Sequence, residues 1–225
     1  MDERLATGVD VADGSDRAET TRWLGVAALA SVGLWVLIVI VLHGVKSDLD
    51  PVETYISDYA IGDNGWLMTT AFVIVGLGML CLAMGLRASL APGKRVLLGV
   101  ILMAVTGVGF ILAGIFTTDP TGADETTTEG SLHLLGSVLV FPVTIVNSFV
   151  LLGVFRRDPR WVSFAERWRW APWVLLVGMI VTFNMPEEIV GLAQRVFAAM
   201  ILGWFAAIAL GVIATSSHQR VASNS

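Results

Sequence analysis

Charged residues are scarce in this chain. Only 15% of its 225 residues are Asp, Glu, Lys or Arg, whereas 55% are apolar and the mean hydropathy is +0.75. A soluble domain carries about 25% charged residues, so this sequence has too little polar material to cover a globule in water. The scarcity excludes a cytosolic enzyme, an intrinsically disordered protein and a nucleic-acid-binding protein.

Cysteine is nearly missing, and the common catalytic motifs do not occur. The single Cys81 excludes a disulfide framework and lies in an apolar run, where we interpret it as a small core residue. The sequence contains no H-E-x-x-H, no C-x-x-C, no G-x-S-x-G and no phosphate-binding loop. It therefore indicates no cofactor and leaves open whether the protein is an enzyme.

Long apolar runs dominate what is present. A helix of about 20 apolar residues crosses the hydrocarbon core, and a spanning helix satisfies its own backbone hydrogen bonds. We predict an all-α fold, a polytopic membrane protein built as a bundle of six transmembrane helices. The predicted spans are Trp23–His43, Trp66–Leu86, Val96–Phe116, Leu132–Phe155, Trp170–Met185 and Val196–Ala214. The fifth is shorter than the others and needs flanking residues or a locally thinner bilayer.

The basic residues predict the orientation. With the N-terminus inside, all but two of the 14 Lys and Arg residues fall on the inner side, and the exceptions are Lys46 and Arg195. We therefore expect a multi-pass protein of the plasma membrane with both termini cytoplasmic. The predicted parts are a disordered cytoplasmic segment (residues 1–22), a six-helix transmembrane domain (23–215) and a cytoplasmic tail (216–225).

Two loops contain amphipathic patterns. Asp50, Pro51 and Glu53 fit the first positions of a helix that would lie on the outer interface before the second span. In the inner loop, Trp161, Phe164 and Trp168 form an apolar stripe beside several arginines. This pattern fits an interfacial segment that contacts anionic lipid, or one that only anchors the topology.

The fourth predicted span is the richest in polar residues. His133, Ser137, Thr144 and Ser148 share one helical face, which we expect to point into the bundle. This face fits either a ligand groove or hydrogen bonds between helices.

The outer rim collects ionisable side chains from separate elements. Arg195 begins the last span, and we expect it to pair with Asp58 or Asp119. Alternatives remain for each group: Asp119 fits a type I turn, Asp58 a solvated helix face and His133 a helix cap. The predicted ligand-binding residues are Ser57, Asp58, Asp119, His133 and Arg195.

Metal binding and catalysis are further possibilities at this rim. His43, Asp119 and His133 are the candidates for a metal site by residue type, although they lack the local spacing of known sites. No catalytic residue is predicted.

The order of the rim motifs resembles a known family. Ile56-Ser57-Asp58-Tyr59 precedes Trp66, and Gly114 to Pro120 closes the third span. Thr128 to His133 opens the fourth span, and Gly191 to Arg195 opens the sixth. Together these segments resemble the prokaryotic six-span membrane family called domain of unknown function 998. The Ser57-Asp58 segment is also similar to a loop of the Frag1/DRAM/Sfk1 membrane proteins.

The resemblance implies a fold and a site but no reaction. In the family a Glu often precedes the arginine, and this chain has Gln194 there. We hypothesise that the protein binds a lipid headgroup or small amphiphile in an outer-leaflet polar pocket. One alternative is a membrane-embedded lipid hydrolase or transferase, with or without a metal, in which Asp119 and His133 act together. The other alternative is a structural partner subunit. Membrane lipid is the expected partner, and Gly203, Ala207 and Gly211 offer a small-residue ladder for a homo-oligomer.

Overall fold

The computed structural model describes residues 3–121 and 123–223 and consists of helices joined by short loops. The elements are α1 (Glu3–Val45), the 3₁₀-helix η1 (Ile56–Ala60), α2 (Trp66–Ser89), α3 (Lys94–Ile115), α4 (Thr128–Phe155), α5 (Val162–Arg167), α6 (Ala171–Thr182) and α7 (Glu187–Ser223). The all-α prediction is confirmed for these residues, which contain no strand.

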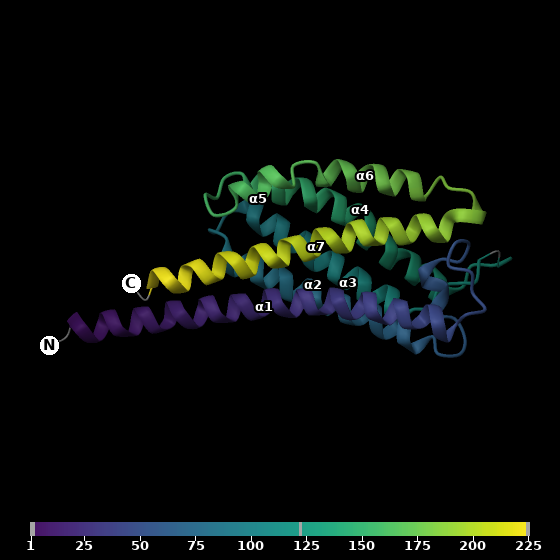
Figure 1. Ribbon diagram of the computed structural model, residues 1–225, viewed down its shortest axis with the longest axis horizontal. Helices are drawn as coiled ribbons and strands as arrows, with labels where there is room; N and C mark the ends of the chain where they lie inside the picture. Colours follow the sequence, from purple (N-terminus) through teal and green to yellow (C-terminus); the bar gives the residue numbers. More distant parts are fainter. Residues whose placement is uncertain (1–2, 122, 224–225) are drawn as a thin grey trace.

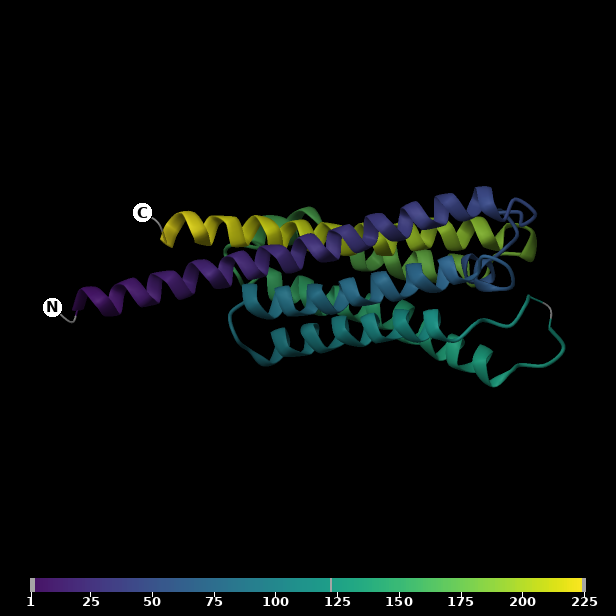
Figure 2. The ribbon, with the colours of Figure 1, turned by 90° about the horizontal axis from the view of Figure 1, so that it is seen from below.

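The long helices run side by side, and both chain termini lie at the same end of the bundle (Figure 1). Figure 2 shows the same arrangement from a second direction. We call this the terminal end. The opposite, distal end contains the loops 46–65, 116–127 and 183–186. α1 packs against α2 and α7, α3 packs between α2 and α4, and α6 packs on α7.

Close backbone contacts at glycine hold the central helices together. A Cβ on Gly107 would lie 2.8 Å from the carbonyl oxygen of Gly76, where α3 crosses α2. A Cβ on Gly109 would lie 2.8 Å from the carbonyl oxygen of Gly136, where α3 crosses α4. Small residues allow helices in a membrane to approach closely, and Gly76, Gly107 and Gly109 serve this packing.

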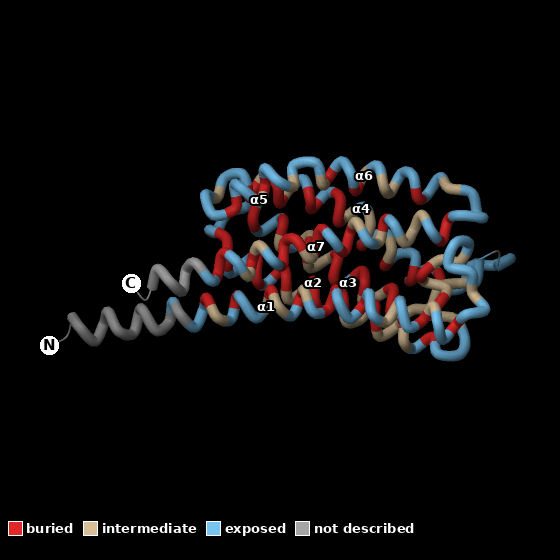
Figure 3. The backbone as a smooth tube through the Cα atoms, in the orientation of Figure 1, coloured by how far each residue is buried: buried red, intermediate tan, exposed pale blue. Residues whose placement is uncertain are grey.

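Within the part of the chain that the structure describes, five helices are long and apolar enough to cross a membrane: Asp16–Val45, Trp66–Ser89, Lys94–Ile115, Thr128–Phe155 and Glu187–Ser217. Their buried residues face one another and their outer surfaces are exposed (Figure 3). Large apolar side chains remain on that outer surface, for example Leu37 at 55%, Val146 at 54% and Leu210 at 54% exposure. Apolar patches of this extent mark a surface that does not face water, so the chain is a membrane protein.

The fifth predicted span corresponds to α6, which has only 12 residues. At 1.5 Å per residue it is about 18 Å long, less than the hydrocarbon thickness of about 30 Å. Together α5 and α6 lead the chain from the terminal end to the distal end (Figure 1).

Residues 16–22, which belong to the N-terminal segment that we predicted to be disordered, are helical in the structure. These residues continue α1, and Ala18 and Thr21 are 5% and 2% exposed. Thr21 donates its hydroxyl proton to the carbonyl oxygen of Arg17. The segment is polar overall, but its buried side has enough small side chains to pack.

The aromatic stripe of the inner loop also differs from its prediction as a lipid-facing surface. Trp161 is fully buried and stacks on Phe155, with ring centroids 4.3 Å apart and planes at 10°. Phe164 packs on the buried Trp204. The stripe faces the bundle because the chain folds back after α4, which turns the apolar side of α5 toward α7.

Candidate functional site

Arg195 lies in the third turn of α7 and joins three segments at the distal end. Its Nε donates to Nε2 of His43 over 3.1 Å, and its Nη1 donates to the carbonyl oxygens of Thr54 and Gly191 over 2.7 and 2.9 Å. The guanidinium lies 5.3 Å from the centre of the Tyr59 ring. The Tyr59 hydroxyl also interacts electrostatically with the guanidinium. Both this hydroxyl and Arg195 Nη2 are buried, and neither makes a hydrogen bond of good geometry to a described residue.

The predicted ion pair of Arg195 with Asp58 or Asp119 is wrong. Among the described residues the one ion pair within 4.0 Å is Arg160 with Asp158, at the terminal end. Arg195 is surrounded by neutral acceptors because the outer loop packs directly on it. A charge placed in a low-dielectric region without a counter-ion is costly, and Arg195 is such a charge at the distal end.

His43, near the end of α1, is fixed in one tautomer by its two neighbours. Its Nδ1 lies 2.6 Å from the carbonyl oxygen of Val39, which can only accept a proton. Nδ1 therefore carries the hydrogen, and Nε2 offers its lone pair to Arg195. His43 is a neutral acceptor for the guanidinium, with both ring nitrogens engaged.

Asp119 caps α4. Its two carboxylate oxygens accept from the Thr127 backbone N–H and hydroxyl over 2.9 and 2.6 Å, and Thr127 accepts from the N–H of Gly130 as the N-cap of α4. A Cβ on Gly130 would collide with the Asp119 carboxylate, so the glycine is required at this position. Asp119 is committed to this cap, which is a structural role.

Asp58 connects the first outer loop to the second. Its Oδ2 accepts the Thr121 hydroxyl proton over 2.9 Å. Burial raises the pKa of Asp58 above its ordinary 3.8, while the Thr121 hydrogen bond and the nearby His133 act in the opposite direction. We predicted Asp58 as a partner of Arg195, but in the structure its electrostatic partner is His133.

His133 lies one turn into α4 and is 6% exposed. Its Nδ1 lies 2.9 and 3.0 Å from the carbonyl oxygens of Ala113 and Phe116, so the ring ties α4 to the last turn of α3. None of its hydrogen bonds to described residues uses Nε2. The metal candidates His43, Asp119 and His133 are thus held by separate partners, and no three His, Cys, Asp or Glu side chains of the described residues gather as a metal site.

A cavity of about 50 Å³ lies inside the bundle at this level, with His133 and Ser57 in its lining. Its walls are mostly aromatic and aliphatic, including Phe72, Phe110 and Phe141. The polar face of α4 predicted from the sequence points inward, since Thr144, Asn147 and Ser148 are at most 1% exposed. We call this space the central cavity. It has room for roughly three or four water-sized groups.

A second space lies on the outside of the bundle, between α1 and α7. This α1–α7 groove has a volume of about 310 Å³ and is lined by apolar side chains of both helices, with Arg195 as its charged member. Gly203 lies in its floor, where an added Cβ would meet nothing within 4 Å. Trp35, Ile56 and Leu202 line both the groove and the central cavity and separate the two spaces.

The first outer loop is not the continuous amphipathic helix that we predicted. Tyr55 is extended, with φ −60° and ψ 150°, and a 3₁₀-helix follows. The loop is pulled onto α7, because Gln194 accepts the Ile56 N–H over 2.6 Å and Val52 accepts the Leu192 N–H over 2.9 Å. Ile56 and Tyr59 consequently pack into the bundle, at 4% and 2% exposure, and not onto the interface.

Sequence reasoning missed three residues that build this region: His43 as a partner of Arg195, Gln194 as a loop anchor, and Lys46. Lys46 is 8% exposed, and its Nζ donates to the carbonyl oxygens of Tyr59 and Ile61. A signal existed for Lys46, because it is the only lysine on its predicted side. No signal existed for the pairing of His43 with Arg195, which are 152 positions apart.

The small-residue ladder of α7 is partly used inside the chain. A Cβ on Gly211 would collide with the Trp161 ring, so this glycine accommodates the tryptophan. Ala207 is 8% exposed, and Gly203 alone of the three is open to a neighbour. Two of the three ladder residues, Ala207 and Gly211, therefore pack within the chain.

Comparison with known families agrees with the resemblance in the sequence. No curated protein and no solved structure shows significant similarity to the chain. The sequence profile of one family, described as protein of unknown function (DUF998), matches residues 7–211. This match covers every described membrane helix except the ends of α1 and α7. The chain is therefore a member of the DUF998 family of membrane proteins.

Proposed function

We propose that the protein binds a membrane amphiphile with an anionic head, held by Arg195 at the distal end of the α1–α7 groove. The observation that carries the proposal is a guanidinium that is partly buried, has no carboxylate within ion-pair distance, and lines an apolar groove. An anionic head beside Arg195 would supply the missing counter-charge.

The shape of the groove suits an acyl chain. From Arg195 to Ala206 it follows α7 for about 16 Å at 1.5 Å per residue. Its other members include Val36, Ile40 and Ala199, which give apolar contact along this length. A chain lying there would be shared between the protein and the surrounding lipid, with its head at the level of Arg195.

The proposal includes six spans with both termini cytoplasmic, in the plasma membrane. α6 becomes the sixth span if the flanking turns up to Trp170 and from Phe183 share the interface with it. The arginines near the terminal end, among them Arg87, Arg95 and Arg157, support this orientation by the excess of basic residues on the cytoplasmic side. The distal end with Arg195 then faces the outer leaflet.

Lipid retention measured by native mass spectrometry tests the proposal. The purified protein would be exchanged into detergent with equal amounts of an anionic and a zwitterionic phospholipid of the same acyl chains. We expect wild type and Arg195→Lys to retain the anionic lipid preferentially, and Arg195→Ala to retain fewer anionic lipids per protein than either. A folded Arg195→Ala protein that retains the same lipid as wild type would show that the head does not bind at Arg195.

A further inference from the structure

A third space lies at the terminal end of the bundle, opposite the distal end that contains Arg195. This α5–α7 groove has a volume of about 390 Å³ and is lined by α5, its preceding loop and the second half of α7. It shares no residue with the α1–α7 groove or the central cavity. Any ligand bound there is independent of the proposed function.

The walls of the α5–α7 groove are rigid and apolar. Trp161 is fully buried between Phe155 and Gly211, and Phe164 stacks on Trp168 with ring centroids 6.1 Å apart. From α7 come small or aliphatic side chains, among them Ala207 and Leu210. Leu210 is 54% exposed and continues this apolar floor onto the membrane-facing surface.

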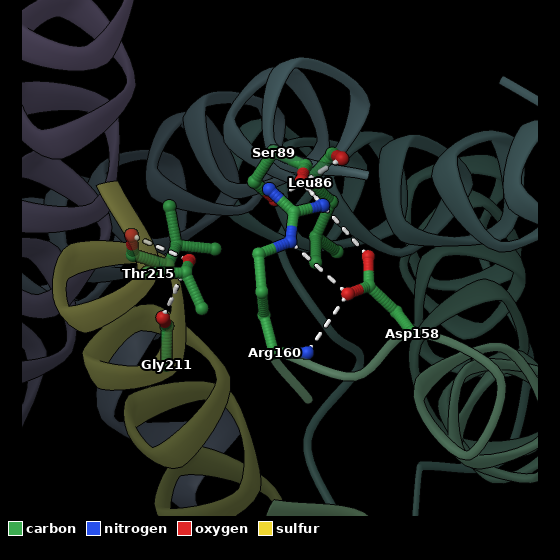
Figure 4. A network of polar contacts seen from close by, with 7 residues as sticks. Leu86, Ser89, Asp158, Arg160, Gly211 and Thr215 are labelled. Carbon is green, nitrogen blue, oxygen red and sulfur yellow. Dashed lines mark hydrogen bonds and ion pairs between the residues drawn. The ribbon is translucent and has the colours of Figure 1, made fainter. Parts of the chain in front are cut away.

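The rim of the groove is basic. Arg160 is oriented by Asp158, which accepts from its Nε and Nη2 over 3.0 and 2.7 Å, and by the carbonyl oxygen of Ser89 at 2.7 Å (Figure 4). Its Nη1 makes no hydrogen bond to a described residue. Arg167, in the last turn of α5, is exposed and lines the same groove with Ser163. No carboxylate is among the lining residues that the structure describes.

We infer that the α5–α7 groove binds an anionic phospholipid, with its head group between Arg160, Ser163 and Arg167 and an acyl chain along Leu210. Charge complementarity selects the head, because Arg167 lines the groove and no acid is among its described lining residues, while Arg160 is paired with Asp158 and adds its Nη1 as a hydrogen-bond donor. The apolar floor that opens toward lipid selects a membrane molecule over a soluble anion. Aromatic side chains in the wall are the type that lies at the membrane interface.

The test compares two arginines of the same short segment. Arg167 lines the groove, whereas Arg169, two positions on, is exposed and stacks on the Trp170 ring at 5.5 Å. Nanodiscs containing phosphatidylglycerol and phosphatidylcholine in equal amounts would be dissolved, and the lipids retained by wild type, Arg167→Gln and Arg169→Gln counted by native mass spectrometry. We expect wild type to retain phosphatidylglycerol.

Arg167→Gln should lower the occupancy of this groove by phosphatidylglycerol about five-fold, the effect of one basic residue near a lipid surface. Arg169→Gln and Arg195→Ala should lower it less, and Arg167→Lys should restore most of it because the charge is kept. Equal retention of the two lipids by wild type, or an equal loss in Arg167→Gln and Arg169→Gln, would overturn the inference. Arg195→Ala is measured in parallel, so a result that contradicts lipid binding in the α5–α7 groove can be distinguished from one that contradicts binding at Arg195.

Discussion

The Nε of Arg195 donates to the Nε2 of His43 over 3.1 Å and so joins the start of α7 to the end of α1. The bond closes the bundle, since α1 and α7 are the first and last helices of the fold. It also holds the guanidinium in the wall of the α1–α7 groove. The stability of the bundle and the proposed amphiphile binding therefore involve the same pair of residues.

Replacing His43 tests the role of its Nε2 as an acceptor. His43→Phe leaves the Nε–H of Arg195 without a partner, which costs about 1–3 kcal/mol for a buried donor. His43→Gln retains an acceptor and should lose less. Thermal unfolding in a fixed detergent measures both variants, and equal loss in the two would show that the ring size matters and not the hydrogen bond.

The tautomer of His43 is a separate prediction. Because Nδ1 faces the carbonyl oxygen of Val39, the ring should be neutral with the proton on Nδ1. Nitrogen NMR of protein labelled in histidine distinguishes this form from the Nε2–H tautomer. The signal that is missing from the His43→Gln spectrum is assigned to His43. An imidazole with its proton on Nε2 at this position would contradict the observed geometry.

Asp119 and Gly130 should be energetically coupled. Asp119→Ala removes the acceptor of two hydrogen bonds at the start of α4 and should cost about 1–2 kcal/mol, as for other helix caps. Gly130→Ala places a methyl group against the same carboxylate and should also destabilise. In the double variant the collision is gone, so its loss should be smaller than the sum of the two single losses.

Additive losses in that cycle would mean that Gly130 is required for a reason other than Asp119. Unfolding midpoints of the four proteins, measured in the same detergent, supply the comparison.

Asp58 should make stability depend on pH. Its folded pKa is raised by burial above 3.8, so the folded protein binds this proton more tightly than the unfolded chain. The stabilising contribution is complete below pH 3.8 and is lost as the pH rises through the raised folded pKa. Asp58→Asn should lack this loss, and Thr121→Ala should extend it to higher pH because the hydrogen bond that lowers the pKa is removed.

Melting temperatures across pH 3–7 for the three proteins test this sign. A wild-type protein that gains stability relative to Asp58→Asn as the pH rises through this window would contradict it.

Gly211 and Gly203 should respond differently to the same substitution. Gly211→Ala forces a methyl group against the Trp161 ring and should destabilise by about 1–3 kcal/mol. Gly203→Ala meets open space and should be neutral or stabilise by up to about 1 kcal/mol, because alanine favours the helix. Thermal unfolding again measures the pair, and equal effects would mean that Trp161 does not occupy the space beside Gly211.

The sequence allowed the membrane class, five of the spans and the inward polar face of α4 to be predicted, because apolar length and helical periodicity reflect local physics. It failed where a tertiary contact decides. The aromatic stripe of α5 has the same helical spacing whether it faces lipid or α7. Its orientation toward α7 is determined by the chain reversal after α4. The first outer loop is broken at Tyr55 by hydrogen bonds to Gln194 and Leu192 that no local pattern reveals.

The candidate site was predicted only in part. Its residues lie at the distal end as expected, but they divide into an α4 cap at Asp119, a loop contact at Asp58 and a buried cation at Arg195. The aspartates predicted to lie near Arg195, Asp58 and Asp119, suggested an acidic partner for its guanidinium. The neutral His43 and two backbone carbonyls took that place instead, because they are held rigidly by helix ends that meet there.

The most direct test of amphiphile binding blocks the α1–α7 groove without changing Arg195. Gly203→Leu fills its floor, and Gly33→Leu adds the same side chain to an exposed site of α1 that lines neither the groove nor the central cavity. Native mass spectrometry of both variants would count the anionic lipids that remain bound. Fewer anionic lipids bound to Gly203→Leu than to Gly33→Leu is the predicted result, and equal retention in folded samples of both would contradict binding in this groove.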